Sequence, residues 1–104
     1  MLICSPCCYF SNMITVNEYF DGAVKSLGYE NEGKSTVGVI EPGDYEFGTS
    51  THETMTVIEG EMSVLLADAA DWKRYTAGEK FEVAANSSFR VKVAAPVSYL
   101  CKYK

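Results

Sequence analysis

The residues whose side chains could do chemistry gather in one short stretch, EFGTSTHETMTVIEGE, at positions 46–61. Glu53 opens a β-rich run, and His52, the only histidine of the chain, comes directly before it. Successive side chains of a strand point to opposite faces, so Thr49 shares a face with Glu53 while His52 points to the other. Glu53 is therefore the candidate functional group of this stretch, and His52 is expected to be a solvated surface residue.

Short runs rich in Val, Thr, Tyr and Phe must position these side chains. None of the runs sustains the helical period of about 3.6 residues. Pro42-Gly43 and residues 77–79 have the composition of turns, and Glu59-Gly60 joins two runs with the signal of a β-hairpin. About eight or nine short strands predict an all-β fold, either a sandwich or a small barrel. The runs occupy residues 17–29, 35–40, 53–66, 80–83, 87–95 and 98–104.

The composition is that of one soluble globular domain. The 104 residues are 47% hydrophobic and 22% charged, which suffices for one core but not for two. A net charge of −5 argues against the basic surface that nucleic acids require, and an anionic ligand such as phosphate would need local donors. No stretch is long and apolar enough to span a bilayer. We expect a cytoplasmic protein without a nucleic-acid or membrane partner.

Residues 1–15 are expected to form a flexible leader ahead of a domain at 16–104. Within the leader, Cys4 and Cys7 have the C-x-x-C spacing and Cys8 is adjacent. One such pair is at best half of a zinc site, so no metal is predicted there. Cys101 stands alone in an apolar strand, where it is expected to pack as a small hydrophobic residue.

The stretch around Glu53 resembles the metal-binding motif of the cupin family. Glu53 is followed by six residues and a glycine, as in that motif, but the histidine positions fall on Phe47, Thr49 or Thr51, depending on the direction of counting. In the second cupin motif, Phe89 takes the place of the last histidine. One carboxylate cannot hold zinc, iron or manganese, which need about three or four protein ligands. The resemblance therefore implies a cupin-type β-barrel, or jelly roll, without a metal.

The carboxylate of Glu53 then has two explanations. It is either a structural group that caps backbone groups at a strand edge, or a functional group that binds ligand hydroxyls and stabilises a developing positive charge. Its neighbours are likewise either plain barrel core or the walls of an apolar pocket with a few polar groups. These neighbours are Tyr45, Phe47, Thr49, Met55 and Phe89, together with the segment Asn86, Ser87 and Ser88.

Several blocks of the sequence, in order and in spacing, resemble the pyrimidine/purine nucleoside phosphorylase family, a group of small metal-free cupins. They are NEYFDGAVKS (17–26), VGVIEPGDYEFGT (37–49), ETMTVIEGEMSVLL (53–66), DW (71–72), AGEKFEVAANSSF (77–89) and SYLCKY (98–103). The resemblance thus covers nearly the whole chain. Ala84 stands where the family has Pro, a change that would loosen this turn without removing a chemical group. The residues before position 16 have no counterpart, and no function is placed there.

The resemblance implies phosphorolysis, in which a purine or pyrimidine nucleoside and phosphate give the free base and α-D-ribose 1-phosphate. No cofactor is implied beyond phosphate as the co-substrate, and a homodimer is expected because cupins often dimerise. Glu53 and Thr49 are the candidate catalytic residues. The remaining candidates would bind substrate: aromatic faces would receive the base, and hydroxyl, amide and backbone donors would hold phosphate. They are Tyr45, Phe47, Met55, Asn86, Ser87, Ser88, Phe89 and Arg90.

Arg90 and Lys25 are the basic candidates for phosphate binding. If Phe89 faces inward, strand alternation sends Arg90 outward, either to solvent or to a partner subunit. Lys25 has the same ambiguity. Two other functions stay open: a non-catalytic cupin that binds sugars or nucleotides, and a metal-dependent cupin oxygenase or isomerase, which the missing ligands disfavour.

Overall fold

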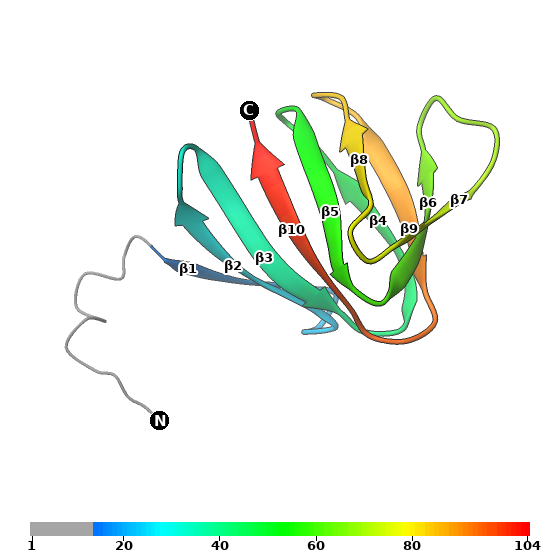
Figure 1. The fold of residues 1–104 in the computed structure, drawn as a ribbon, viewed down its shortest axis with the longest axis horizontal. Coiled ribbons are helices and arrows are strands. Elements are labelled where there is room, and N and C mark those ends of the chain that lie inside the picture. The colour runs from blue at the N-terminus through cyan, green and yellow to red at the C-terminus, as the bar shows by residue number, and fades with distance from the viewer. Residues whose placement is uncertain (1–13) are drawn as a thin grey trace.

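The structure, a computed structural model, describes residues 14–104 and contains ten strands in that range (Figure 1). This is an all-β fold, as expected, with slightly more strands than the eight or nine anticipated. The strands are β1 (Thr15–Tyr19), β2 (Val24–Glu30), β3 (Lys34–Ile40), β4 (Gly43–Gly48), β5 (Glu53–Glu59), β6 (Glu61–Leu66), β7 (Lys73–Thr76), β8 (Lys80–Val83), β9 (Ser88–Val93) and β10 (Val97–Tyr103).

The expected leader lies almost wholly outside the described residues. Cys4, Cys7 and Cys8 all fall in that part of the chain. The last leader residue, Thr15, begins strand β1 and pairs with Gly28 of β2. Residues 14–104 contain no helix with the length and apolarity that a membrane crossing requires.

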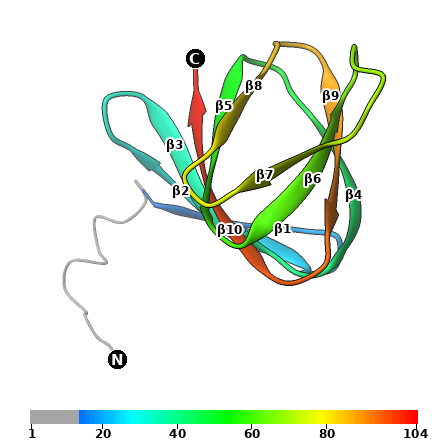
Figure 2. The ribbon, with the colours of Figure 1, turned by 45° about the vertical axis from the view of Figure 1, so that its right-hand side comes forward.

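The strands form two antiparallel sheets that face each other (Figure 2). The large sheet has the order β1-β2-β3-β10-β5-β8 and the small sheet has the order β4-β9-β6-β7. From β3 onward, each connection except β6–β7 carries the chain from one sheet to the other. The two sheets are not joined into one closed ring of hydrogen bonds, so the structure shows two facing sheets and not the closed barrel that was expected.

The core lies between the sheets because side chains alternate along every long strand. In β9, for example, Phe89, Val91 and Val93 are buried while Arg90 and Lys92 are exposed. Full burial of one such apolar side chain stabilises the fold by about 1.5–3 kcal/mol. The same alternation decides which side chains can reach the space between the sheets.

The turn at Gly60 corrects the hairpin expected at Glu59-Gly60. Strands β5 and β6 flank this glycine but do not pair, because β5 pairs with β8 and β10 while β6 pairs with β7 and β9. Gly60 has φ of +92°, and a Cβ there would lie 3.0 Å from the carbonyl oxygen of Pro96. The glycine therefore permits a tight passage from one sheet to the other against the β9–β10 connection.

Candidate functional site

A cavity of about 410 Å³ lies between the sheets. Eight of its thirteen lining residues come from strands of the large sheet, four from the small sheet and one from the turn between β1 and β2. The size is that of a pocket for a small organic ligand. The lining residues are Tyr19, Phe20, Ser26, Ile40, Glu46, Phe47, Gly48, Glu53, Met55, Phe89, Tyr99, Cys101 and Tyr103.

The large sheet provides a polar wall built around Glu53. Strand β10 lies beside β5 in a register that places Tyr103 opposite Glu53 and Cys101 opposite Met55. The Cys101 thiol donates to Oε1 of Glu53 over 3.5 Å, and the Tyr103 hydroxyl lies 3.2 Å from Oγ1 of Thr36. The carboxylate thus shares this wall with a thiol and a phenol, and the thiol is its hydrogen-bond donor.

Burial controls the protonation of this wall. It raises the pKa of Glu53 above the ordinary value of 4.5, against smaller opposing effects of the Cys101 hydrogen bond and of Lys34 and His52. Burial, reinforced by the charge of Glu53, raises the pKa of Cys101 to about 12. Burial likewise raises the pKa of Tyr99 to about 12 and also raises that of Tyr103. Near neutral pH the thiol and the phenols therefore keep their protons and can donate, while an ionised Glu53 can only accept.

Gly38 of β3 makes room for the polar wall. A Cβ at this position would lie 2.7 Å from the hydroxyl of Tyr99 and 2.7 Å from the carbonyl oxygen of Lys25. Tyr99 is 7% exposed. Its ring can therefore reach across β3 toward Ser26 of β2 only because position 38 has no side chain.

The opposite side of the cavity is aromatic. Phe47 of β4 and Phe89 of β9 are register partners in the small sheet, with ring centroids 5.5 Å apart. The ring of Phe20, from the β1–β2 turn, meets Phe47 edge-on with centroids 5.6 Å apart. A ligand in the cavity would lie between hydrogen-bonding groups on one side and ring faces and edges on the other.

The structure brings together four of the ten residues proposed from sequence as site residues. Phe47, Glu53, Met55 and Phe89 all line the cavity, as their shared strand parity predicted. Tyr45 does not line it: this residue is buried in the core, and its hydroxyl donates to the carbonyl oxygen of Glu41 over 2.8 Å.

Thr49 holds two loops together instead of lining the cavity. Its hydroxyl donates to the carbonyl oxygen of Ala84 over 2.7 Å and accepts from the backbone N–H of Ser87 over 2.9 Å. The backbone N–H of Thr49 also donates to the carbonyl oxygen of Ser87 over 2.9 Å. The segment of Asn86, Ser87 and Ser88 is therefore fixed next to the end of β4, but none of its residues lines the cavity.

The basic candidates point away from the cavity. Arg90 lies on the outer face of the small sheet, 3.6 Å from a carboxylate oxygen of Asp44 and over the ring of Trp72. Lys25 lies on the outer face of the large sheet, in a shallow apolar groove. The residues that line the cavity within the described part of the chain include no lysine or arginine.

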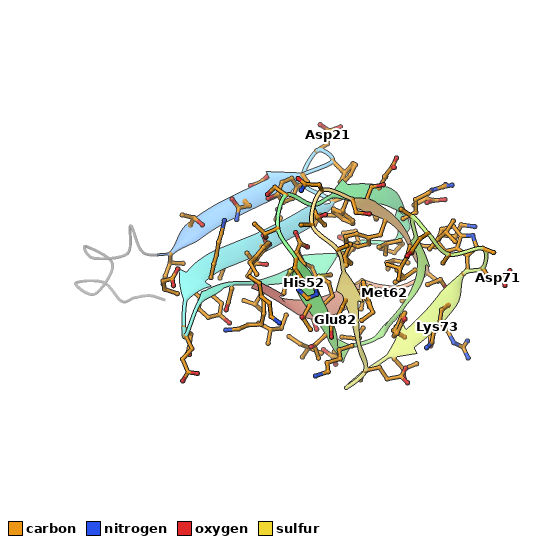
Figure 3. All side chains as sticks on the ribbon, turned by 90° about the horizontal axis from the view of Figure 1, so that it is seen from above. Asp21, His52, Met62, Asp71, Lys73 and Glu82 are labelled. Atoms are coloured by element: carbon orange, nitrogen blue, oxygen red, sulfur yellow. The ribbon has the colours of Figure 1, made fainter. Side chains whose placement is uncertain are left out.

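His52 lies outside the cavity, as expected, although it precedes β5 and strand alternation does not apply to it, and it is not simply solvated. Its Nε2 lies 2.8 Å from Oε1 of Glu82 on β8, and Figure 3 shows the two side chains next to each other. Nδ1 is buried without a hydrogen-bond partner. In residues 14–104, no group of three or more His, Cys, Asp or Glu side chains could hold a metal ion.

Sequence reasoning missed the contribution of β10 and of the first hairpin. Tyr99, Cys101 and Tyr103 share one strand parity, which was a usable signal, but Cys101 was assigned only to the core. Cys101 is buried and also faces the cavity. From the first hairpin, Tyr19, Phe20 and Ser26 line the cavity as well.

Comparisons with known proteins agree with this picture. The family model described as pyrimidine/purine nucleoside phosphorylase matches residues 14–103. The pyrimidine/purine nucleoside phosphorylase of Aeromonas salmonicida is 52% identical, over 88% of this chain and 98% of the relative. That of Alcanivorax borkumensis is 54% identical over 88% and 98%.

Solved structures give the same result for the fold. A protein of unknown function from Vibrio parahaemolyticus is 46% identical, with a TM-score of 0.85 over 88% of this chain and 98% of that one. An RmlC-like cupin from Shewanella frigidimarina is 18% identical, with a TM-score of 0.69 over 90% and 86%, and it shows a shared cupin-like fold. The chain belongs to the pyrimidine/purine nucleoside phosphorylase family.

Proposed function

We propose that the chain is a cytoplasmic enzyme that cleaves purine and pyrimidine nucleosides with phosphate, giving the free base and α-D-ribose 1-phosphate. The observation that carries the proposal is one cavity with a desolvated glutamate on one wall and phenylalanine rings on the other. Relatives at about half identity over nearly their whole length are named as phosphorylases of this kind, which supports it.

The chemistry of the reaction suits these two walls. As the C1′–N bond breaks, its electron pair leaves with the base, positive charge develops on the ribose, and a phosphate oxygen forms the new bond to C1′. The ionised Glu53 accepts hydrogen bonds from ribose hydroxyls and stabilises that charge. The protonated Tyr99 and Tyr103 donate hydrogen bonds to ribose or base. The rings of Phe47 and Phe89 receive the base, and a ring face accepts purines and pyrimidines alike.

Phosphate is assigned in this proposal to the loop of residues 86–88. Asn86 is exposed and has φ of +56°, and a left-handed residue is one component of the backbone nests that bind anions. Thr49 supports the loop through its bonds to Ala84 and Ser87 and is proposed to act by positioning. Arg90 is not placed in the phosphate site of its own chain, because its side chain pairs with Asp44 on the outer face of the small sheet.

The direct test is release of base from a panel of nucleosides, with and without phosphate. We expect uracil from uridine and hypoxanthine from inosine, only when phosphate is present, with ribose 1-phosphate formed in equal amount. EDTA is expected to leave the rate unchanged, because the cavity offers carboxylate, phenol, thiol and ring groups but no cluster of metal ligands in the described residues. If no nucleoside of the panel releases its base in a phosphate-dependent way, the proposal is refuted.

One observation favours a second candidate, a non-catalytic cupin that binds nucleosides or sugars. No lysine or arginine is found among the described cavity-lining residues to hold phosphate. Such a protein would be stabilised against heat by uridine or ribose without turnover. Stabilisation that phosphate does not change, together with no release of base, would select this candidate over the enzyme.

We also propose a homodimer formed through the outer face of the large sheet. The register there aligns a row of apolar side chains across β1, β2, β3 and β10, and two of them are 71% and 45% exposed. Exposed apolar patches mark interaction sites, and a two-fold interface would place this uncharged row against itself. Light scattering should give twice the mass of one chain, and Leu27→Asp should halve it. The row consists of Val16, Leu27, Val37 and Leu100.

A further inference from the structure

The turn between β1 and β2 has an unusual backbone for its sequence. Phe20 and Asp21 have φ of 55° and 57°, and Gly22 follows with φ of 87°. The N–H of Gly22 donates to the carbonyl oxygen of Tyr19 over 3.2 Å, which closes the turn. Two consecutive left-handed residues favour Asn, Asp or Gly. A phenylalanine in this conformation is strained, because its Cβ crowds the backbone.

Core packing does not explain why phenylalanine occupies this position. The ring of Phe20 contacts Tyr45 and Phe47, with centroid distances of 5.0 and 5.6 Å, yet the residue is 47% exposed. Half of the hydrophobic gain of burial is therefore absent while the backbone strain is retained. Its neighbour Asp21 lies at the tip of the turn and points away from the body of the molecule (Figure 3).

Phe20 belongs to the cavity as well as to this aromatic cluster. Phe20 is one of the lining residues, and it comes from a turn, whereas Phe47 and Phe89 are fixed in paired strands of the small sheet. The edge-on contact at 90° between Phe20 and Phe47 places two differently oriented rings on the same side of the cavity. A flat ligand in the cavity would therefore have aromatic side chains of both the turn and the sheet beside it.

We infer that Phe20 is a base-binding residue, which the left-handed β1–β2 turn presents to the cavity so that its ring stacks on the nucleobase. This inference rests on the proposed nucleoside phosphorylase function and adds a third aromatic ring, presented by a turn, to the rings of Phe47 and Phe89. Stacking on an aromatic face needs no particular pattern of donors and acceptors, so it serves one-ring and two-ring bases alike. A ring on a turn adjusts to the base more easily than a ring in a paired strand.

The test compares four variants by steady-state kinetics with uridine and inosine. Phe20→Asn keeps a residue that tolerates the left-handed backbone but removes the ring, and Phe20→Leu keeps apolar bulk without an aromatic face. Both are expected to raise KM for both nucleosides by about tenfold, the effect of one lost stacking contact, with a much smaller change in kcat. Phe20→Tyr keeps the face and should restore most of the binding. The matched control is Asp21→Gly, which relieves the adjacent strained position and keeps the ring, and its KM should stay within about twofold of the parent value.

Thermal melts separate this role from a structural one. Phe20→Asn should melt no lower than the parent protein, because the strain is relieved where the ring is lost. If KM of Phe20→Asn and Phe20→Leu stays within twofold of the parent value, the inference is overturned while the proposed function stands. If the parent protein releases no base, the proposed function fails, and calorimetry with inosine alone decides on Phe20. The inference is supported if Phe20→Leu binds inosine about tenfold more weakly than the parent protein does. It is overturned if the two proteins bind inosine equally well or if the parent protein does not bind it.

Discussion

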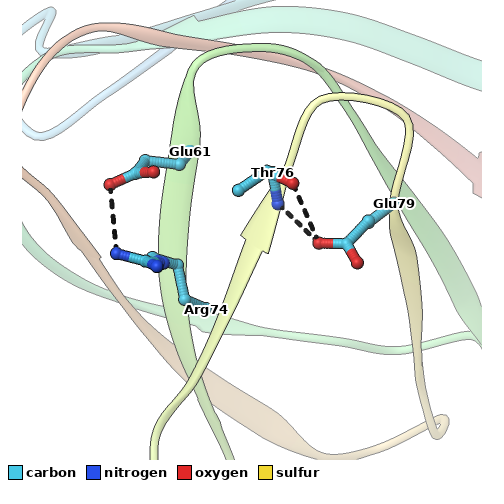
Figure 4. A network of polar contacts seen from close by, with 4 residues as sticks. All are labelled: Glu61, Arg74, Thr76 and Glu79. Atoms are coloured by element: carbon cyan, nitrogen blue, oxygen red, sulfur yellow. Dashed lines mark hydrogen bonds and ion pairs between the residues drawn. The ribbon is translucent and has the colours of Figure 1, made fainter.

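Glu53 and Glu79 lie toward opposite ends of the paired strands β5 and β8 and have opposite surroundings. Glu53 begins β5 and faces the cavity, whereas Glu79 lies in the turn between β7 and β8. Around Glu79 the turn supplies donors, because the backbone N–H and the hydroxyl of Thr76 lie 2.8 and 3.1 Å from Oε1 (Figure 4). These bonds lower the pKa of Glu79, whereas burial raises the pKa of Glu53.

The difference shows what each carboxylate contributes. The fold stabilises the charge of Glu79, and the charged carboxylate in turn stabilises the β7–β8 turn. The fold leaves the charge of Glu53 half-buried, with one thiol donor at 3.5 Å. An ionised group that folding tolerates without stabilising is characteristic of functional sites. Variants at the two positions should therefore affect stability and activity in opposite ways.

The largest effect is expected for Glu53→Gln. Loss of a charge that stabilises the transition state lowers kcat/KM by about 100-fold or more. The same change removes a desolvated charge, so the free energy of unfolding at neutral pH should rise or stay unchanged. Nucleoside assays and urea unfolding measure the two quantities.

The matched control for this variant is Glu59→Gln, at an exposed position on the same strand. It should keep full activity and parent stability. A Glu53→Gln enzyme with kcat/KM within a few-fold of the parent would show that this carboxylate is only structural.

The pH dependence should differ in sign at the two sites. The folded pKa of Glu53 is raised, so its contribution to stability is present below the ordinary 4.5 and is lost as pH rises through the folded pKa. Activity needs the ionised form and rises over the same interval. Subtracting the urea-unfolding curve of Glu53→Gln from that of the parent protein, pH by pH, isolates this contribution. A difference that grows in favour of the parent protein with increasing pH would contradict the predicted sign.

The sequence predicted part of both walls of the cavity because strand alternation is a local property. Parity placed Phe47, Glu53, Met55 and Phe89 on the inward faces of their strands, and the structure confirms that they line the cavity. Parity identifies the face of a strand but not the position along the strand at which the cavity lies. Tyr45 therefore has the predicted parity but lies in the core, outside the cavity. Thr49 was misplaced for another reason: residues 49–52 are not in a strand, and alternation does not apply there.

The rest of the polar wall depends on long-range pairing that no local pattern records. Strand β10 lies between β3 and β5, which brings Tyr103 opposite Glu53, fifty positions earlier in the chain. The alternation of β10 was visible, but its neighbours were not. Phe20 was hidden for a third reason, since its left-handed backbone runs against the residue preference of the turn.

A smaller effect is expected for Glu79→Gln. Because the folded pKa of Glu79 is lowered, its stabilising contribution is present above 4.5 and is lost as pH falls through the folded pKa. The variant should therefore melt slightly below the parent protein at neutral pH, and the two should converge in acid. Base release should be unchanged, because Glu79 does not line the cavity. Scanning calorimetry at several pH values measures the convergence, and a variant that differs most in acid would reverse the assignment.

The smallest effect is expected for Arg74→Ala, which removes the ion pair next to the β7–β8 turn. Figure 4 shows Arg74 reaching Glu61 from the neighbouring strand, with Nη1 of Arg74 and Oε2 of Glu61 3.9 Å apart. Both side chains are more than half exposed, so water screens the attraction and an exposed pair of this kind contributes about 0–1 kcal/mol. Urea unfolding of Arg74→Ala should therefore differ little from the parent protein at moderate ionic strength. A large loss would mean that charge–charge attraction, rather than the hydrogen bonds from Thr76 to Glu79, fastens this part of the molecule.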